Sequence, residues 1–200
     1  MAIKTDAYYA SCTYDSPVGM LTLAASEEGL KGLWLNGQKY FAGTLDRPMT
    51  EGANDHLDQA SHWLDAYFAG ESPAIAALSL APNGSGFQQA VWKLLCEIPS
   101  GEVRTYGDLA KDVATHLGKE SMSAQAVGGA VGRNPISIIV PCHRVIGKDK
   151  SLTGHGGGFD VKNICSHTNS APISKIYLLA TAQGALLDRH NKNFRSCNGT

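Results

Sequence analysis

A thiol, an imidazole and a guanidinium occupy three consecutive positions, Cys142, His143 and Arg144. A cysteine attacks as the thiolate, and a neighbouring cation or a polarised water lowers the pKa of its thiol. The triplet therefore predicts a reactive cysteine whose proton passes to His143 through a bridging water. The alternative is a buried structural cysteine, which packs like a small hydrophobic side chain.

The segment before this triplet predicts how the thiol is held. Ile138, Ile139 and Val140 form an apolar, β-branched run that leads into Pro141. Such a run is typical of a short buried strand, and proline ends it because it has no N–H to donate to a neighbouring strand. We therefore expect Cys142 at the junction of a strand and a loop.

Composition and charge restrict the class of protein. The chain has 200 residues, 43% of them hydrophobic, which suits one domain or two small ones. There is no membrane-length apolar run and no signal peptide, and the five cysteines form no C-x-x-C pair, so we expect a cytoplasmic protein. Residues 1–86 carry 4 Lys and Arg against 10 Asp and Glu, whereas residues 87–200 carry 13 against 8. The second half would face a polyanion, although ordinary surface variation gives similar counts.

The first half has the pattern of a supporting α/β domain. Strands are expected at residues 8–14, 20–26 and 30–35. Apolar residues at helical spacing predict an amphipathic helix over 56–69, which Gly70 ends. Residues 71–86 contain two prolines and two glycines and are expected to form a linker.

The second half predicts a helix-turn-helix. A helix is expected from Phe87 to Pro99, a second from Tyr106 to about His116, and a third over 124–131 with Ser123 as its N-cap. Gly128 and Gly129 lie inside the third helix, where each costs about 1 kcal/mol relative to alanine. A helix accepts this cost when something approaches its backbone closely, and the sequence leaves open a narrow minor groove or another part of the protein.

Several motifs agree in order and spacing with one known family. They are Phe87…Val91-Trp92, Ile98-Pro99-x-Gly101, Thr105-Tyr106-Gly107-x-Leu109-Ala110, Ala126-Val127-Gly128-Gly129, Arg133-Asn134-Pro135, Pro141-Cys142-His143-Arg144-Val145-Ile146 and Leu152-Thr153-Gly154. Together they resemble the bacterial O6-alkylguanine-DNA alkyltransferases. The resemblance implies an α/β N-terminal domain at 1–86, with a ribonuclease-H-like sheet plus helix. It further implies a mainly α, helix-turn-helix or winged-helix-like alkyltransferase domain at 87–162, and it leaves a divergent tail at 163–200.

The function implied by the resemblance is stoichiometric DNA repair. A monomer would bind double-stranded DNA, flip an O6-alkylguanine (and also an O4-alkylthymine) out of the stack, and keep the alkyl group on Cys142. The base has to leave the stack because its alkylated atom cannot be reached inside a duplex. Neither a metal nor an organic cofactor is implied, since the alkyl group comes from the DNA.

The resemblance also assigns residues. Cys142 would be the acceptor, His143 the base, Tyr106 the proton donor to the leaving guanine, and Asn134 a hinge whose amide bonds the turn and orients His143. Arg144 is expected to be structural or to face a phosphate. The DNA-binding residues would be Ser123, Gln125, Ala126, Gly128, Gly129 and Arg133, and the substrate pocket would contain Val145, Gly154, His155 and Gly156.

The sequence departs from the family in two places. Gln125 stands where many relatives have an arginine that fills the space of the flipped base, so we expect weaker but retained DNA binding. After Lys162 the family's final helix is missing, and Asn169 replaces the glutamate that supports the histidine. A frame read from the third base of the Lys162 codon can regenerate the family tail. We therefore hypothesise a one-base deletion near Lys162, which gene sequencing would test, and we expect impaired transfer.

Four other interpretations remain. A cysteine protease could recruit His155 and Asn134, but no oxyanion motif is visible. A zinc site of Cys142, His143 and His155 lacks a fourth ligand. A protein that only binds alkylated DNA would not need Cys142, and the altered tail leaves room for a non-functional product.

Overall fold

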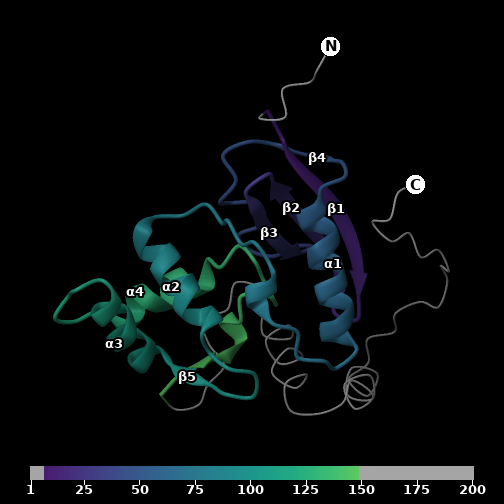
Figure 1. Ribbon diagram of the computed structural model, residues 1–200. Coiled ribbons are helices and arrows are strands. Elements are labelled where there is room, and N and C mark those ends of the chain that lie inside the picture. The colour runs from purple at the N-terminus through teal and green to yellow at the C-terminus, as the bar shows by residue number, and fades with distance from the viewer. Residues whose placement is uncertain (1–6, 149–200) are drawn as a thin grey trace.

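The computed structural model describes residues 7–148. Figure 1 shows a sheet with one long helix on one side of the molecule and a group of shorter helices on the other. The sheet has the strand order β3-β2-β1-β4. Its strands are β1 (Tyr9–Ser16), β2 (Gly19–Ser26), β3 (Gly29–Leu35) and β4 (Met49–Glu51). The first three are the strands that were expected, and they form an antiparallel meander, whereas β4 was not predicted and runs parallel to β1.

Helix α1 (Asp55–Phe68) covers one face of the sheet (Figure 1). Its first turn is capped by Asn54, whose side-chain oxygen accepts a hydrogen bond from the His56 N–H at 2.9 Å. The buried side chains recur at helical spacing and are Leu57, Ala60, Trp63, Leu64, Tyr67 and Phe68. They pack against the apolar residues of β2 and β3, so the amphipathic pattern is confirmed.

Part of the expected linker is hydrogen-bonded to the sheet. It contains a short 3₁₀ turn, η1 (Ile75–Ala77). Leu30 of β3 donates its N–H to Ser79 at 2.8 Å, and its carbonyl accepts from Ala81 at 2.9 Å. Its last residues start helix α2 (Gly86–Cys96), because Ser85 and Gln88 form a reciprocal capping box.

The two short helices expected in the second half are present. They are α3 (Tyr106–His116) and α4 (Ala124–Gly132), which pack on α2. Thr105 caps α3 and Ser123 caps α4, each by accepting the N–H three residues later. Gly118 follows α3 with a φ of 63°, the left-handed conformation expected of a residue just past a helix end. Two short strands, β5 (Arg104–Thr105) and β6 (Val145–Ile146), pair in parallel beside α3.

The predicted strand at 138–140 is wrong. The residues from Ser137 to Val140 form turns, and Ile138 has a φ of 71°. The apolar run is nevertheless buried, with Ile136, Ile139 and Val140 all in the core that the two halves share. A short apolar run indicates burial but does not separate a strand from a buried loop. Within residues 7–148, no helix has the length and hydropathy needed to cross a membrane.

Candidate active site around Cys142

The loop that carries Cys142 is organised by the side chain of Asn134. Its amide nitrogen donates to the Val140 carbonyl at 2.9 Å and to the Ile136 carbonyl at 3.2 Å, and its amide oxygen accepts from the Ile136 N–H at 3.0 Å. Asn134 is buried, so these groups have little water to bond instead. The amide therefore bonds the turn as expected, while an orienting role for His143 stays a prediction.

Cys142 lies in a turn rather than at the end of a strand. Its N–H donates to the Val140 carbonyl at 2.8 Å, a tight bond that spans Pro141. Cys142 then starts a 3₁₀ turn, η2 (Cys142–Arg144). Both Cys142 and His143 are buried, at 1% and 2% exposure. The turn holds thiol and imidazole on one short rigid element instead of on the opposite faces of a strand.

Tyr106 is the first residue of α3 and interacts electrostatically with Cys142. The pKa of Tyr106 is raised to about 12, mainly by burial and in part by an electrostatic interaction with Cys142. The phenol is therefore protonated at neutral pH and can donate a proton. Its ring also lies against Gly128, where an added Cβ would be 3.7 Å from the ring carbons. A Cβ at this distance would make ordinary van der Waals contact, so packing against Tyr106 does not by itself require glycine at 128.

Arg144 has a structural role in this loop. Its Nη1 atom donates to the Ile98 carbonyl at 2.7 Å, beyond the end of α2. Burial lowers the pKa of the guanidinium, and nearby Tyr67 and Cys96 partly offset this effect. The bond connects the turn after Cys142 to the segment after α2, in agreement with one of the two expected roles.

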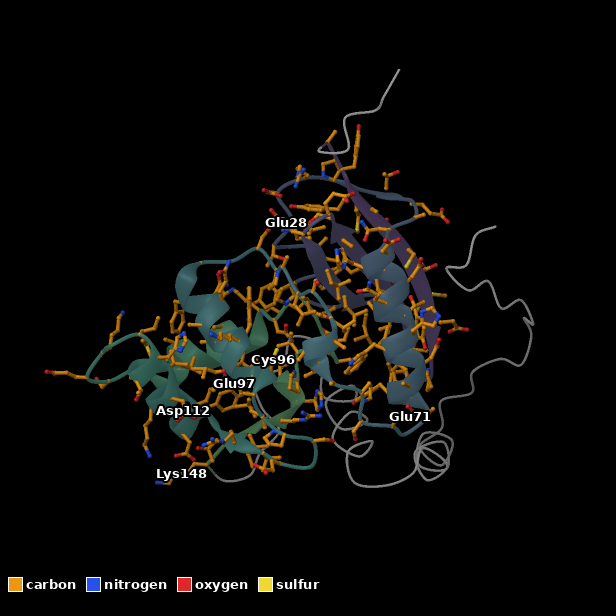
Figure 2. The ribbon with its side chains drawn as sticks, viewed as in Figure 1. Glu28, Glu71, Cys96, Glu97, Asp112 and Lys148 are labelled. Carbon is orange, nitrogen blue, oxygen red and sulfur yellow. The ribbon has the colours of Figure 1, made fainter. Side chains whose placement is uncertain are left out.

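Cys96, which Figure 2 labels, is another cysteine of the described residues and interacts electrostatically with Arg144. Its pKa is raised to about 11, mainly by burial and in part by the neighbouring Glu97, while Arg144 partly offsets the rise. The thiol is therefore protonated at neutral pH and is a poor nucleophile.

The residues expected to meet DNA lie on α4 and at its end. Ser123, Gln125 and Ala126 are exposed around the first turn, whereas Gly128 and Gly129 are half-buried. Arg133 is exposed, and its guanidinium carbon lies 5.3 Å from the centre of the Tyr40 ring in the loop after β3.

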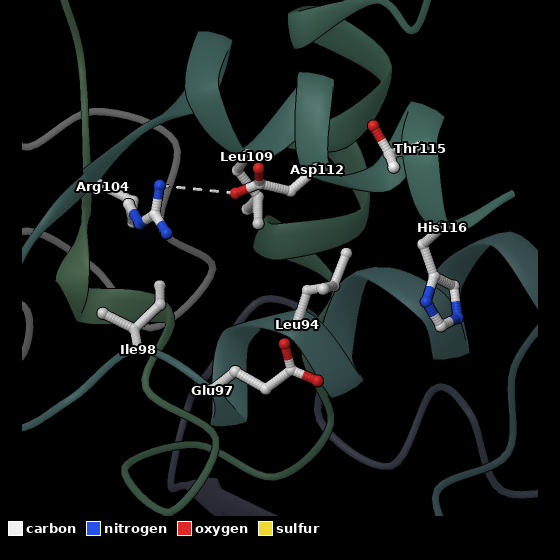
Figure 3. A pocket seen from close by; sticks show the side chains of 8 residues that line it. All are labelled: Leu94, Glu97, Ile98, Arg104, Leu109, Asp112, Thr115 and His116. Atoms are coloured by element: carbon white, nitrogen blue, oxygen red, sulfur yellow. Dashed lines mark ion pairs between the residues drawn. The ribbon is translucent and has the colours of Figure 1, made fainter. Parts of the chain in front are cut away.

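The cavities lie beside this site. One of about 390 Å³ is floored by Leu94, Ile98 and Leu109, and Figure 3 shows Arg104 and Asp112 facing each other beside it. Their side chains are 3.5 Å apart and about half exposed, so the pair adds little stability. A second cavity of about 310 Å³ lies behind the active-site loop and is lined in part by Ile138 and Arg144. The lining of neither includes Cys142 or Tyr106.

Three residues that position the loop were missed in the sequence. Leu33 of β3 bonds both Pro135 and Ser137 through its backbone, and the buried Gln38 accepts a hydrogen bond from the Ser137 hydroxyl. The one available signal was a serine inside an apolar run, because a buried hydroxyl requires a partner.

Several predicted site residues lie outside the described residues. They are Gly154, His155, Gly156 and Asn169, together with the whole tail at 163–200. Val145 is described and is buried in β6. Among residues 7–148 there is no group of three or more His, Cys, Asp or Glu side chains that could hold a metal ion.

Comparisons with known proteins match nearly all of the described chain. Residues 8–82 match a family model described as "6-O-methylguanine DNA methyltransferase, ribonuclease-like domain", and residues 86–168 match "6-O-methylguanine DNA methyltransferase, DNA binding domain". The chain is 45% identical over 157 residues to the methylated-DNA–protein-cysteine methyltransferase of Methanosarcina acetivorans, covering 78% of this chain and 93% of the relative. It is 37% identical to the Haemophilus influenzae protein of the same name, covering 80% and 85%.

A solved structure matches in the same way. The crystal structure of Mycobacterium tuberculosis OGT in complex with DNA superposes with a TM-score of 0.70 at 39% sequence identity. The match covers 84% of this chain and 99% of that one.

Proposed function

This chain belongs to the 6-O-methylguanine DNA methyltransferase family, and we propose that it repairs DNA by transferring an alkyl group from O6-alkylguanine to its own Cys142. The sulfur–carbon bond forms as the carbon–O6 bond breaks, and the guanine leaves with the electron pair. One proton leaves the thiol and one proton reaches the guanine, so the exchange is neutral overall. The protein is consumed, because the thioether is stable and has no built-in route back to the thiol.

The burial of Cys142 and His143 together on one 3₁₀ turn is the observation that carries this proposal. His143 is the proposed base, and Tyr106 is the proposed acid for the leaving guanine. A soft thiolate suits attack on a neutral aryl ether. The relatives are named as methyltransferases, which favours chemistry over binding alone.

Finer features complete the proposal. The N-terminal domain at 1–86 is ribonuclease-H-like, and the domain at 87–162 is helix-turn-helix or winged-helix-like. The start of α2 at Gly86 and the break between the two family matches support that boundary. The protein is a cytoplasmic monomer whose partner is double-stranded DNA, and O4-alkylthymine is a second substrate. Residues Ser123, Gln125, Ala126 and Arg133 contact the duplex.

The direct test is intact-protein mass spectrometry after incubation with a duplex that holds one O6-methylguanine. Peptide mapping should place one methyl group on Cys142, with the DNA demethylated in equal amount. A duplex with one O4-methylthymine is a second arm for the second substrate. Folded protein that gains no methyl group from O6-methylguanine would refute the proposal.

Tyr106→Phe is expected to slow transfer about 100-fold, since a positioned general acid contributes about 10²–10⁴ to the rate. Because the pKa of Tyr106 is about 12, its phenol stays protonated up to about pH 10, so the difference between parent and variant should hold across pH 6–10. Single-turnover rates measured across this range check both points. Tyr14→Phe, which removes a 2.7 Å hydrogen bond to Asp65, is the matched control and should react at the parent rate.

Arg133→Gln is expected to weaken binding to alkylated and unmodified duplexes by the same factor. A phosphate contact carries no sequence information, and its loss should reduce the slope of log affinity against log salt by about 1. Fluorescence anisotropy at several salt concentrations measures the slope. Arg47→Gln, which removes an arginine stacked on Tyr9 in the N-terminal domain, is the control. An unchanged slope for Arg133→Gln would show that Arg133 does not contact the duplex.

A further inference from the structure

The active-site loop completes the edge of the N-terminal sheet. Strand β3 is one of the two outer strands, so one of its edges has no partner strand within the sheet. The Leu33 N–H donates to the Pro135 carbonyl at 2.9 Å, and the Leu33 carbonyl accepts from the Ser137 N–H at 2.9 Å. The loop therefore pairs with β3 in parallel at one position, Leu33 opposite Ile136. An edge that would otherwise be open to water is used to fix the loop.

Two buried side chains add a second connection at this point. The Gln38 side-chain oxygen accepts from the Ser137 hydroxyl at 3.0 Å and from the Leu35 N–H at 3.2 Å. Gln38 is 8% exposed and Ser137 is 1% exposed. The two residues are 99 positions apart in sequence and belong to different halves of the chain. A buried polar pair of this kind fixes geometry, because neither group has water as an alternative partner.

The connection reaches Cys142 through a short series of backbone bonds. The Ser137 carbonyl accepts from the Ile139 N–H at 2.8 Å, which closes a tight turn around Ile138. The Val140 carbonyl then accepts from the Cys142 N–H at 2.8 Å. Few torsions are left free between Ser137 and the nucleophile.

Ile138 has a backbone conformation that its β-branched side chain disfavours. It has a φ of 71°, a conformation that β-branched residues rarely adopt and that costs about 1–3 kcal/mol. Such a residue persists only where its surroundings over-determine it. The hydrogen bonds from Ser137 to β3 and to Gln38 fix the residue directly before Ile138, and so restrict the backbone of Ile138 from its N-terminal side.

We propose that Gln38 and Ser137 form an interdomain latch that positions Cys142 for alkyl transfer. The latch rests on the proposed function and deepens it. It holds Ile138 in its left-handed conformation and thereby sets where the sulfur lies relative to the flipped base. The N-terminal domain thus acts on the rate of the chemical step, from a distance and without contacting the substrate. Gln38 and Ser137 are positioning residues.

A double-mutant cycle tests the latch. Gln38→Met keeps the length of the side chain without its acceptor, and Ser137→Ala removes the donor. Each variant and the double variant are mixed with methylated duplex, and the single-turnover rate is measured as a function of duplex concentration. We expect each single variant to lower the saturating rate about tenfold, because small misplacements of reacting groups are costly. The duplex concentration at half the maximal rate should not change.

The double variant separates a shared function from two independent effects. It should react no more slowly than the slower single variant, because either change alone already opens the latch. Gln38→Glu keeps an acceptor for Ser137 and should react faster than Gln38→Met, even if burying its carboxylate makes it less stable. Gln89→Met, which removes an exposed bond to Gly84, is the matched control and should react at the parent rate.

Other outcomes overturn the latch. The latch is refuted if folded variants keep the saturating rate of the parent. It is also refuted if the rate losses of the two single variants multiply in the double variant, or if only the duplex concentration at half the maximal rate changes. Hydrogen exchange of the peptide at 136–142 is a readout that needs no activity, and it should be faster in both single variants. A parent that takes up no methyl group refutes the proposed function, whereas an active parent with unchanged variants refutes the latch alone.

Discussion

Cys142→Ala is expected to take up no methyl group while it still binds methylated duplex. The substitution removes the sulfur that forms the new bond, and a buried alanine offers no other nucleophile at this position. The fold should tolerate the change, because a small apolar side chain replaces another and the cavity left behind costs only about 1 kcal/mol. Intact-protein mass spectrometry after prolonged incubation measures uptake, and fluorescence anisotropy measures binding.

Cys96→Ala is the matched control for this loss. Cys96 is a second cysteine packed against the same core, but its pKa of about 11 keeps the thiol protonated at neutral pH. Its removal should leave uptake at one methyl group per protein. A methyl group found on Cys96 or Cys12 of the Cys142→Ala protein would show that the nucleophile has been assigned to the wrong residue.

The helices around the site were predictable because their signals are local. Thr105 and Ser123 cap the helices that follow them, and Gly118 follows the end of α3 in a left-handed conformation. Each of these signals acts within a few residues, so the sequence alone contains it. The contact between Tyr106 and Gly128 could not be predicted from the sequence, because the glycine pattern allowed either DNA or protein as the neighbour.

The active-site loop was mispredicted because its structure depends on distant residues. The run from Ile138 to Val140 has strand-like composition, but Asn134 bonds both ends of the turn and Leu33 occupies the pairing position. Tertiary hydrogen bonds overrode the local preference, and the left-handed conformation of Ile138 is the result. Nothing in the spacing of Gln38 and Ser137, 99 residues apart, predicts their contact.

Asn134→Ala is expected to reduce both stability and transfer. The change removes three buried hydrogen bonds and leaves the Ile136 N–H and the Val140 carbonyl without the amide. A loss of about 2–4 kcal/mol in the free energy of unfolding is expected from such groups. The single-turnover rate should fall at least about 100-fold in protein that is still folded, because the Val140 carbonyl also accepts from the Cys142 N–H. Urea unfolding and rapid-quench kinetics at low temperature measure the two effects separately.

Two further variants decide whether the rate depends on the turn itself. Asn134→Asp keeps an acceptor for the Ile136 N–H but turns a carboxylate oxygen toward the carbonyls of Ile136 and Val140, so it should be no faster than alanine. Asn83→Ala removes bonds to Tyr9 and Asp46 in the N-terminal domain, and should lose stability without losing rate. If Asn134→Ala instead reacted at the parent rate whenever it is folded, the amide would stabilise the fold without placing the sulfur. The position of Cys142 would then have to depend on the bonds from β3 and Gln38 alone.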